Sequence, residues 1–172
     1  MISWLCFEWR TDKVPDAGSL VAPLVIRQAE KSDEAGVSKV IKSAFAVDSG
    51  WGDVNRTVEA VLTSATERVF AEPAPHCLVV VHGSRIIGAS LLAADAGAED
   101  HLISGPCILH EYRNRGLASA LLAASLGHLA KLDVKTARGL TRANSITARF
   151  IYPKFGGSSR PFEGDPLKLE AA

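Results

Sequence analysis

The sequence predicts an α/β (α+β) fold, because short apolar runs typical of strands alternate with longer segments of helical periodicity. Residues 77–82 and 85–93 are apolar runs joined by a tight turn that contains glycine, which indicates an antiparallel hairpin. Residues 117–132 carry leucines at three- and four-residue steps, which line one face of a helix. Over the whole chain, such segments predict about six or seven strands and about four helices.

Composition restricts the function classes. The chain has 172 residues, the size of one domain, and 47% of them are hydrophobic, enough for a sizeable core. Lys plus Arg and Asp plus Glu number 19 each, so no overall charge favours nucleic acid or an acidic membrane. The chain lacks a membrane-length apolar run and a signal-peptide pattern at its start. We therefore expect a cytoplasmic protein without a nucleic-acid or membrane partner.

Cysteines and histidines give no sign of a metal site. Cys6, Cys77 and Cys107 are widely spaced and odd in number, which favours buried, reduced thiols over disulfides. No Cys-x-x-Cys pair occurs, and the histidines lack ligand spacing. We predict no bound metal.

Residues 1–20 form an N-terminal extension with an unusual share of aromatic side chains, among them Trp4, Phe7 and Trp9. Leaving such side chains in water is costly, so we expect them to be buried. Two arrangements would bury them: an added strand, or an arm that packs on a partner chain and so implies a possible homodimer. Residues 11–18 predict a turn or linker before the main domain.

Local patterns predict the remaining elements. Residues 24–27 are typical of a strand, and Ser32 or Asp33 is placed to cap the helix that follows. A second helix is expected over residues 55–70, ending before two prolines. Further along, we expect a strand over residues 101–109, a strand over residues 135–141, a short helix capped by Asn144 or Ser145, a loop over residues 156–164 and a last strand over residues 166–170.

The loop before residues 117–132 predicts an anion site. Arg113, Arg115 and Gly116 stand where the helix begins, next to unpaired backbone N–H groups and the positive end of the helix dipole. Glycine lets a ligand approach the backbone, and Ala118 is nearly as small. Several N–H groups that point one way suit a diphosphate better than a single carboxylate.

Two motifs resemble those of a known family. Arg113-Asn114-Arg115-Gly116-Leu117-Ala118, preceded by Glu111-Tyr112, resembles the Arg/Gln-x-x-Gly-x-Gly/Ala signature of the GNAT superfamily of acyl-CoA-dependent N-acyltransferases. Tyr152-Pro153-Lys154-Phe155-Gly156-Gly157 is similar to the Tyr-x-x-Leu-Gly-Phe that closes the GNAT core. The resemblance covers residues 24–170. It implies a GNAT-like mixed, mostly antiparallel central sheet in a single acyltransferase domain over residues 21–172.

The resemblance implies acetyl-CoA as cosubstrate and a primary amine, on a small molecule or a peptide, as acceptor. The strand over residues 103–109 would splay from its neighbour and pair with the pantetheine arm. The implied coenzyme-binding residues are Ile108, Leu109, His110, Arg113, Asn114, Arg115, Gly116, Leu117, Ala118, Ser119, Asn144 and Ser145.

For catalysis, the resemblance implies Tyr152 as general acid toward the departing thiolate. The carboxylate usual on the strand before the anion loop is missing, because Leu102 occupies that position. Glu99, Asp100 and His101 remain alternative bases, and Asp95 is a further option.

Other features bear on the acceptor end. Trp51 and Asp53 are possible acceptor contacts, with a core Trp and a helix cap as the rival roles. The closing motif also departs from the family pattern. Ser145 stands where the family often has Asn, unless Asn144 serves there with a one-residue shift, Gly157 replaces an aromatic residue, and Pro153 follows the tyrosine directly. These departures and the missing carboxylate support an alternative function, a non-catalytic acyl-CoA-binding or regulatory module on the same fold.

Overall fold

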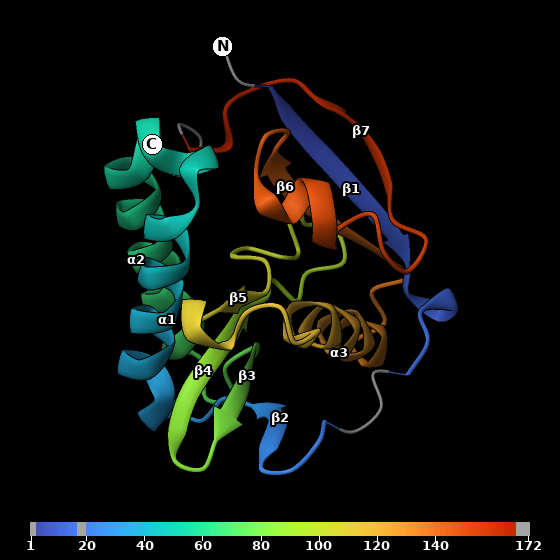
Figure 1. Cartoon of the computed structure of the whole chain (residues 1–172). Coiled ribbons are helices and arrows are strands. Elements are labelled where there is room, and N and C mark those ends of the chain that lie inside the picture. The colour runs from blue at the N-terminus through green and yellow to red at the C-terminus, as the bar shows by residue number, and fades with distance from the viewer. Residues whose placement is uncertain (1–2, 17–19, 168–172) are drawn as a thin grey trace.

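The computed structural model describes residues 3–16 and 20–167 (Figure 1). Its strands are β1 (Trp4–Arg10), β2 (Leu24–Gln28), β3 (Cys77–His82), β4 (Arg85–Leu91), β5 (Cys107–Ile108), β6 (Thr136–Arg142) and β7 (Ser158–Phe162). The long helices are α1 (Glu34–Val47), α2 (Asn55–Ala71) and α3 (Leu117–Lys131). Short helical segments are η1 (Thr11–Lys13), η2 (Lys31–Asp33), η3 (Ser49–Val54), η4 (His110–Tyr112) and the π-helical η5 (Thr147–Ile151). The strands form antiparallel sheets, so the predicted α/β class is confirmed.

The four-stranded sheet has the order β2-β3-β4-β5 and contains the predicted hairpin β3–β4. Helix α1 packs against β4 and β5, while α3 packs against β3 and β4. Figure 1 shows α1 and α2 on one side of this sheet and α3 on the other. Because both faces are covered, β3 is buried along its length up to His82, as its unbroken apolar run predicts. No helix in the described part of the chain is long and apolar enough to cross a membrane.

Strand β1 lies in the middle of the three-stranded sheet, which has the order β6-β1-β7. Residues 4–10 of the extension therefore form an added strand within this chain. The ring of Trp9 is buried, and its Nε1 donates a hydrogen bond to the Lys154 carbonyl at 3.0 Å. Trp4 packs edge-on against Trp51, with ring centroids 5.5 Å apart. Trp4 thus supports the wall beside α1, whereas Phe7 and Trp9 pack against Tyr152.

The strand predicted over residues 101–109 is interrupted. Leu102 forms an isolated bridge with Leu92, and regular pairing resumes only at β5. The interruption has a local cause: Gly105 has φ +63°, and Pro106 lacks an N–H. Ser104 stabilises the distorted segment, because its hydroxyl accepts a hydrogen bond from the Leu91 N–H and donates one to the Gly105 carbonyl.

The C-terminal predictions were wrong in two places. The segment predicted to be a loop, residues 156–164, contains β7, which pairs with β1. Its Pro161 is tolerated because β7 is an edge strand and needs no second partner. The strand predicted over residues 166–170 is absent at Pro166 and Leu167, which are helical. Residues 168–170 lie outside the described part of the chain.

Candidate active site

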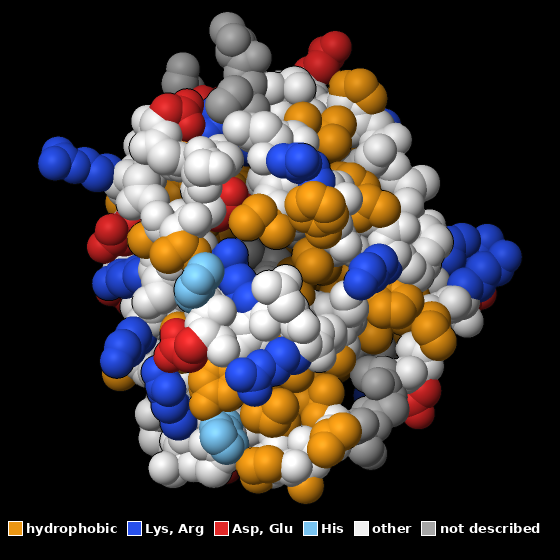
Figure 2. Space-filling model, viewed as in Figure 1, with side chains coloured by type: hydrophobic (Ala, Val, Ile, Leu, Met, Phe, Trp, Pro, Cys, Tyr) orange, Lys and Arg blue, Asp and Glu red, His pale blue; other side chains and the backbone are white. Residues whose placement is uncertain are grey.

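A cavity of about 310 Å³ lies between the end of α1, strand β5, the start of α3 and η5. Figure 2 shows its mouth near the middle of one face, with hydrophobic side chains on one side and basic side chains on the other. Its lining includes Phe45, Asp48, Trp51, Ser104, Cys107, Ile108, Tyr112, Arg113, Asn114, Gly116, Leu117, Ala118, Ser119, Ile146, Thr147, Phe150 and Lys154.

One end of the cavity is the start of α3. Gly116 caps the helix with φ +74°, and Asn114 also has a positive φ of 63°. These left-handed residues turn the chain sharply, so that the first N–H groups of α3, which have no intrahelical acceptor, are presented at the cavity. A Cβ added to Gly116 would meet no atom within 4 Å, which shows open space at this point. Lys154 donates a 2.6 Å hydrogen bond to the Ser119 hydroxyl and adds positive charge to the same end.

Along its floor the cavity meets the open edge of β5. The Leu109 N–H donates to the Ile87 carbonyl of β4 at 2.9 Å. In an antiparallel strand the next residue faces the other way, so the N–H and C=O of Ile108 point away from β4. In the described part of the chain the four-stranded sheet ends at β5, and Ile108 lines the cavity. The backbone of Ile108 is therefore free to pair with a ligand.

The structure brings together seven of the predicted coenzyme-binding residues in the cavity wall: Ile108, Arg113, Asn114, Gly116, Leu117, Ala118 and Ser119. The other five do not line it. Leu109 bonds β4, His110 starts η4 on the exposed surface, and Arg115 lies over the Tyr112 ring at 5.2 Å. Asn144 is exposed, whereas Ser145 is buried and caps η5 by accepting a hydrogen bond from the Ala148 N–H at 3.0 Å.

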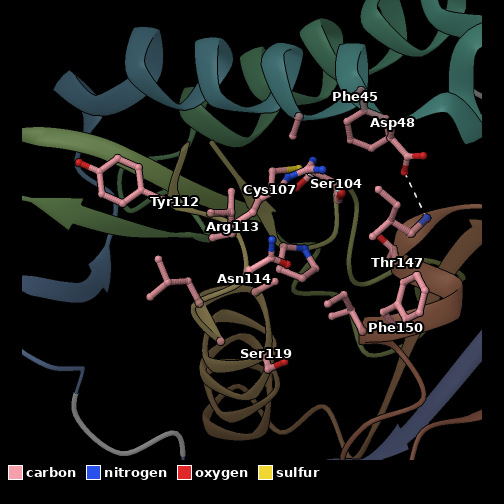
Figure 3. A pocket seen from close by; sticks show the side chains of 18 of the residues that line it. Phe45, Asp48, Ser104, Cys107, Tyr112, Arg113, Asn114, Ser119, Thr147 and Phe150 are labelled. Carbon is pink, nitrogen blue, oxygen red and sulfur yellow. Dashed lines mark hydrogen bonds between the residues drawn. The ribbon is translucent and has the colours of Figure 1, made fainter. Parts of the chain in front are cut away.

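The opposite end of the cavity is aromatic and, among the described residues, contains one carboxylate. Figure 3 shows Phe45 and Asp48 on one side, at the end of α1, and Thr147 and Phe150 on the other. Asp48 is only 8% exposed. Sequence reasoning missed it. The sequence places this Asp directly after a helical segment and shortly before Gly50 and Trp51. An Asp in that position is equally typical of a turn, so its place in the sequence does not by itself indicate a binding residue.

The predicted bases lie elsewhere, and none of them lines the cavity. Asp100 accepts a hydrogen bond from the Leu140 N–H, and His101 Nδ1 accepts one from the Arg138 N–H. Both side chains thus satisfy backbone donors of β6. His101 is fully buried and its Nε2 donates to the Asp95 carbonyl, so neither ring nitrogen is free to take a proton from an amine. Asp95 and Glu99 are exposed on the same loop.

Tyr152 is 1% exposed and lies behind the cavity wall, where its ring packs edge-on against Phe7 and Trp9. Burial raises its pKa well above the usual value of a phenol. Its hydroxyl is 2.7 Å from the position that a Cβ on Gly105 would occupy. Gly105 thus leaves space for this hydroxyl between two cavity residues, Ser104 and Pro106.

The two possible acceptor contacts of η3 have different positions. Trp51 lines the cavity and packs against Phe45, with ring centroids 5.1 Å apart. Asp53 does not line it, and instead forms an ion pair with Arg142, with an Nη1–Oδ1 distance of 2.6 Å. Hydrogen bonding to Arg142 lowers the pKa of Asp53.

Comparison with known proteins identifies the family. The model of the acetyltransferase (GNAT) domain matches residues 32–159, more than half of the chain. The chain therefore belongs to the GNAT acetyltransferase family, which confirms the resemblance seen in its motifs. No curated protein matches the sequence.

Solved structures agree on the fold. A GCN5-related N-acetyltransferase from Sphaerobacter thermophilus is similar with a TM-score of 0.68 at 19% identity, over 93% of this chain and 49% of that one. A GNAT-family acetyltransferase from Colwellia psychrerythraea gives a TM-score of 0.62 at 16% identity, over 94% of this chain and 54% of that one. The chain thus spans about half the length of these two proteins.

The buried His101 predicts a pH effect on stability. Burial, helped by the positive charge of Arg138, lowers its pKa below the usual 6.5, although the hydrogen bond to the Asp95 carbonyl acts in the opposite direction. The folded state thus takes up this proton at lower pH than the unfolded state. The stabilisation is complete above pH 6.5 and is lost as the pH falls through the folded-state pKa. NMR titration should show the His101 ring neutral, protonated on Nε2, at pH 6.5.

Urea unfolding provides the matching stability measurement. Between about pH 7.5 and pH 5.5 the unfolding free energy should fall less in His101→Gln than in the unchanged protein. His110→Gln, at an exposed position, serves as the control and should retain the full dependence. A His101 ring that titrates at or above pH 6.5 would show this interpretation to be wrong.

Proposed function

We propose that this chain transfers an acetyl group from acetyl-CoA to a primary amine. One observation carries the proposal: a single cavity runs from the start of α3, past the open edge of β5, to the carboxylate and aromatic residues at the end of α1. The first end suits a diphosphate, the edge suits an extended amide-containing arm, and the last end suits an amine. Membership of an acetyltransferase family supports the same reading.

The residues present fit coenzyme A. The N–H groups that begin α3, together with Arg113, would hold the diphosphate, and the Ile108 backbone would pair with the pantetheine amides. The open space at Gly116 leaves room for phosphate oxygens close to the backbone. Bound acetyl-CoA would supply the acetyl group as a thioester, an activated acyl donor.

In the proposed reaction, the neutral amine nitrogen attacks the thioester carbonyl. A C–N bond forms, the C–S bond breaks, and the proton lost by the nitrogen ends on the thiolate. Aligning the two reactants accounts for roughly 7–11 kcal/mol of the barrier. An amine of ordinary pKa, about 10.4, costs about 4–5 kcal/mol to deprotonate at pH 7. Following the resemblance, we assign donation of the proton to the departing thiolate to Tyr152, whose hydroxyl lies behind Gly105 and whose high pKa keeps it protonated. The phenolate that this leaves takes up the proton that the nitrogen releases, so the net transfer is from nitrogen to sulfur.

A binding module without activity is the second candidate, and Leu102 favours it. This side chain is 1% exposed at the position where the resemblance implies a carboxylate. Such a module would bind coenzyme A and release no thiol with any amine, so the two functions differ in a single assay.

The first test combines calorimetry with coenzyme A and thiol release from acetyl-CoA with a panel of amines. Gly116→Val should weaken coenzyme A binding at least about tenfold, since a side chain would enter the phosphate space and strain a positive φ. Gly83→Val is the matched control, because Gly83 also has a positive φ and open surroundings but lies in the β3–β4 turn. Binding without thiol release would favour the module, and absence of binding would exclude both functions.

The second test concerns Tyr152. Tyr152→Phe keeps the buried ring and removes the proton donor, so kcat should fall roughly 10²-fold or more. Coenzyme A affinity should stay within about twofold, because Tyr152 does not line the cavity. Steady-state kinetics and calorimetry measure these effects, with thermal unfolding to verify the fold. Full turnover in this variant would remove Tyr152 from the chemistry.

A further inference from the structure

Asp48 is a buried carboxylate whose hydrogen-bonding capacity is only half used. Oδ1 accepts from the Gly50 N–H at 2.9 Å. Oδ2 accepts from the Ile146 N–H at 3.3 Å, the hydrogen bond drawn at Asp48 in Figure 3. Two carboxylate oxygens offer about four acceptor positions, so two remain. Within residues 3–16 and 20–167 no ion pair involves Asp48. A buried charge without a cation is unfavourable unless a partner is supplied.

Two of the nearby cations, Arg142 and Lys154, are engaged elsewhere. Arg142 donates to the Gly50 carbonyl at 3.1 Å, but its charge is matched by Asp53 through two hydrogen bonds. Lys154 bonds Ser119 at the α3 end of the cavity. Arg113 also faces the cavity, and in the proposed function it is taken up by the diphosphate. The carboxylate of Asp48 is therefore left for a ligand cation.

Aromatic rings line the same end of the cavity as this carboxylate. Phe45 and Trp51 form an edge-on pair on the α1 side, and Phe150 lies across the cavity. Phe150 is 58% exposed although it is large and apolar. An exposed apolar side chain in a cavity wall is suited to contact an apolar part of a ligand. Arg142 already lies over the Trp51 ring at 5.8 Å and Arg149 over the Phe150 ring at 5.2 Å. These rings therefore suit the apolar body of an amine, and its ammonium group is left to the carboxylate.

We propose that Asp48 binds the ammonium group of the acceptor and that the acceptor is a monoamine with an aromatic or similar apolar body and no carboxylate. The proposal rests on the acetyl transfer proposed above and names its substrate class. The bound ammonium loses one proton to solvent before it attacks. Asp48 thus acts as a substrate-binding residue.

The charges that line the cavity disfavour two common classes of amine. A polyamine would bring additional positive charges toward Arg113 and Lys154, which line the same cavity. An amino acid would bring a carboxylate close to Asp48, with Arg113 engaged by phosphate. Like charges in a partly desolvated site repel strongly, so both classes should bind more weakly than a monoamine.

The experiment uses 2-phenylethylamine, L-phenylalanine and spermidine as probes. For the unchanged protein, kcat/KM should be at least about tenfold higher for 2-phenylethylamine than for the other two. Calorimetry on protein saturated with coenzyme A, which carries no acetyl group, measures 2-phenylethylamine binding without turnover. Asp48→Asn should weaken this binding at least about tenfold and raise KM more than it lowers kcat. Glu59→Gln, on the exposed face of α2, is the matched control and should leave binding within about twofold.

A second variant tests the amine end of the cavity while leaving the hydrogen bonds of Asp48 to the backbone intact. Phe150→Ala, at an exposed position, should weaken 2-phenylethylamine binding at least about threefold and leave ethanolamine unaffected. A preference for L-phenylalanine or spermidine, or unchanged affinity in either variant, would overturn the substrate assignment and leave acetyl transfer intact. Absence of coenzyme A binding would overturn the proposed function as well.

Discussion

The separation of the two sheets beside β5 is the constraint on which the site depends. Strand β5 pairs with β4 on one side, and β6 pairs with β1 rather than with β5. The sheets meet at residues 100–102, where the His101 and Leu102 N–H groups both bond the Arg138 carbonyl. Beyond that point the strands diverge. The divergence exposes the Ile108 backbone and makes room for the cavity.

Side chains stabilise this separation of the strands. Asp100 and His101 accept hydrogen bonds from the β6 backbone, so donors that a neighbouring strand would otherwise satisfy are already occupied. Gly105 and Pro106 prevent regular pairing after Leu102. Strand β1 fills the other edge of β6, and its Trp4 supports Trp51 in the cavity wall. The N-terminal strand is thus part of the support of the amine end.

The sequence predicted the parts of the fold that depend on local patterns. The apolar runs of β3 and β4, and the periodic leucines of α3, gave correct elements because burial of a continuous face fixes both pattern and structure. Strand β7 was missed because its residues are mostly exposed and include a proline, and its partner β1 lies at the other end of the chain. Non-local pairing of a polar edge strand leaves no local signal.

The same distinction applies to the site. The residues at the start of α3 were predictable, because Gly116 and its neighbours must adopt a special backbone. The amine end was not, because it joins α1, η3 and η5, which are distant in sequence. Asp100 and His101 were proposed as bases from their sequence position, yet this position makes them hydrogen-bond acceptors for β6. Asp48, outside any motif, is the carboxylate that lines the cavity within the described part of the chain.

Binding of the coenzyme at the open edge of β5 can be measured by amide hydrogen exchange at Ile108. In the free protein this N–H points away from β4, so it should exchange readily. On addition of coenzyme A, its exchange should slow at least about tenfold as the N–H acquires an acceptor. An Ile108 amide whose exchange is unchanged when the coenzyme is bound would contradict the account.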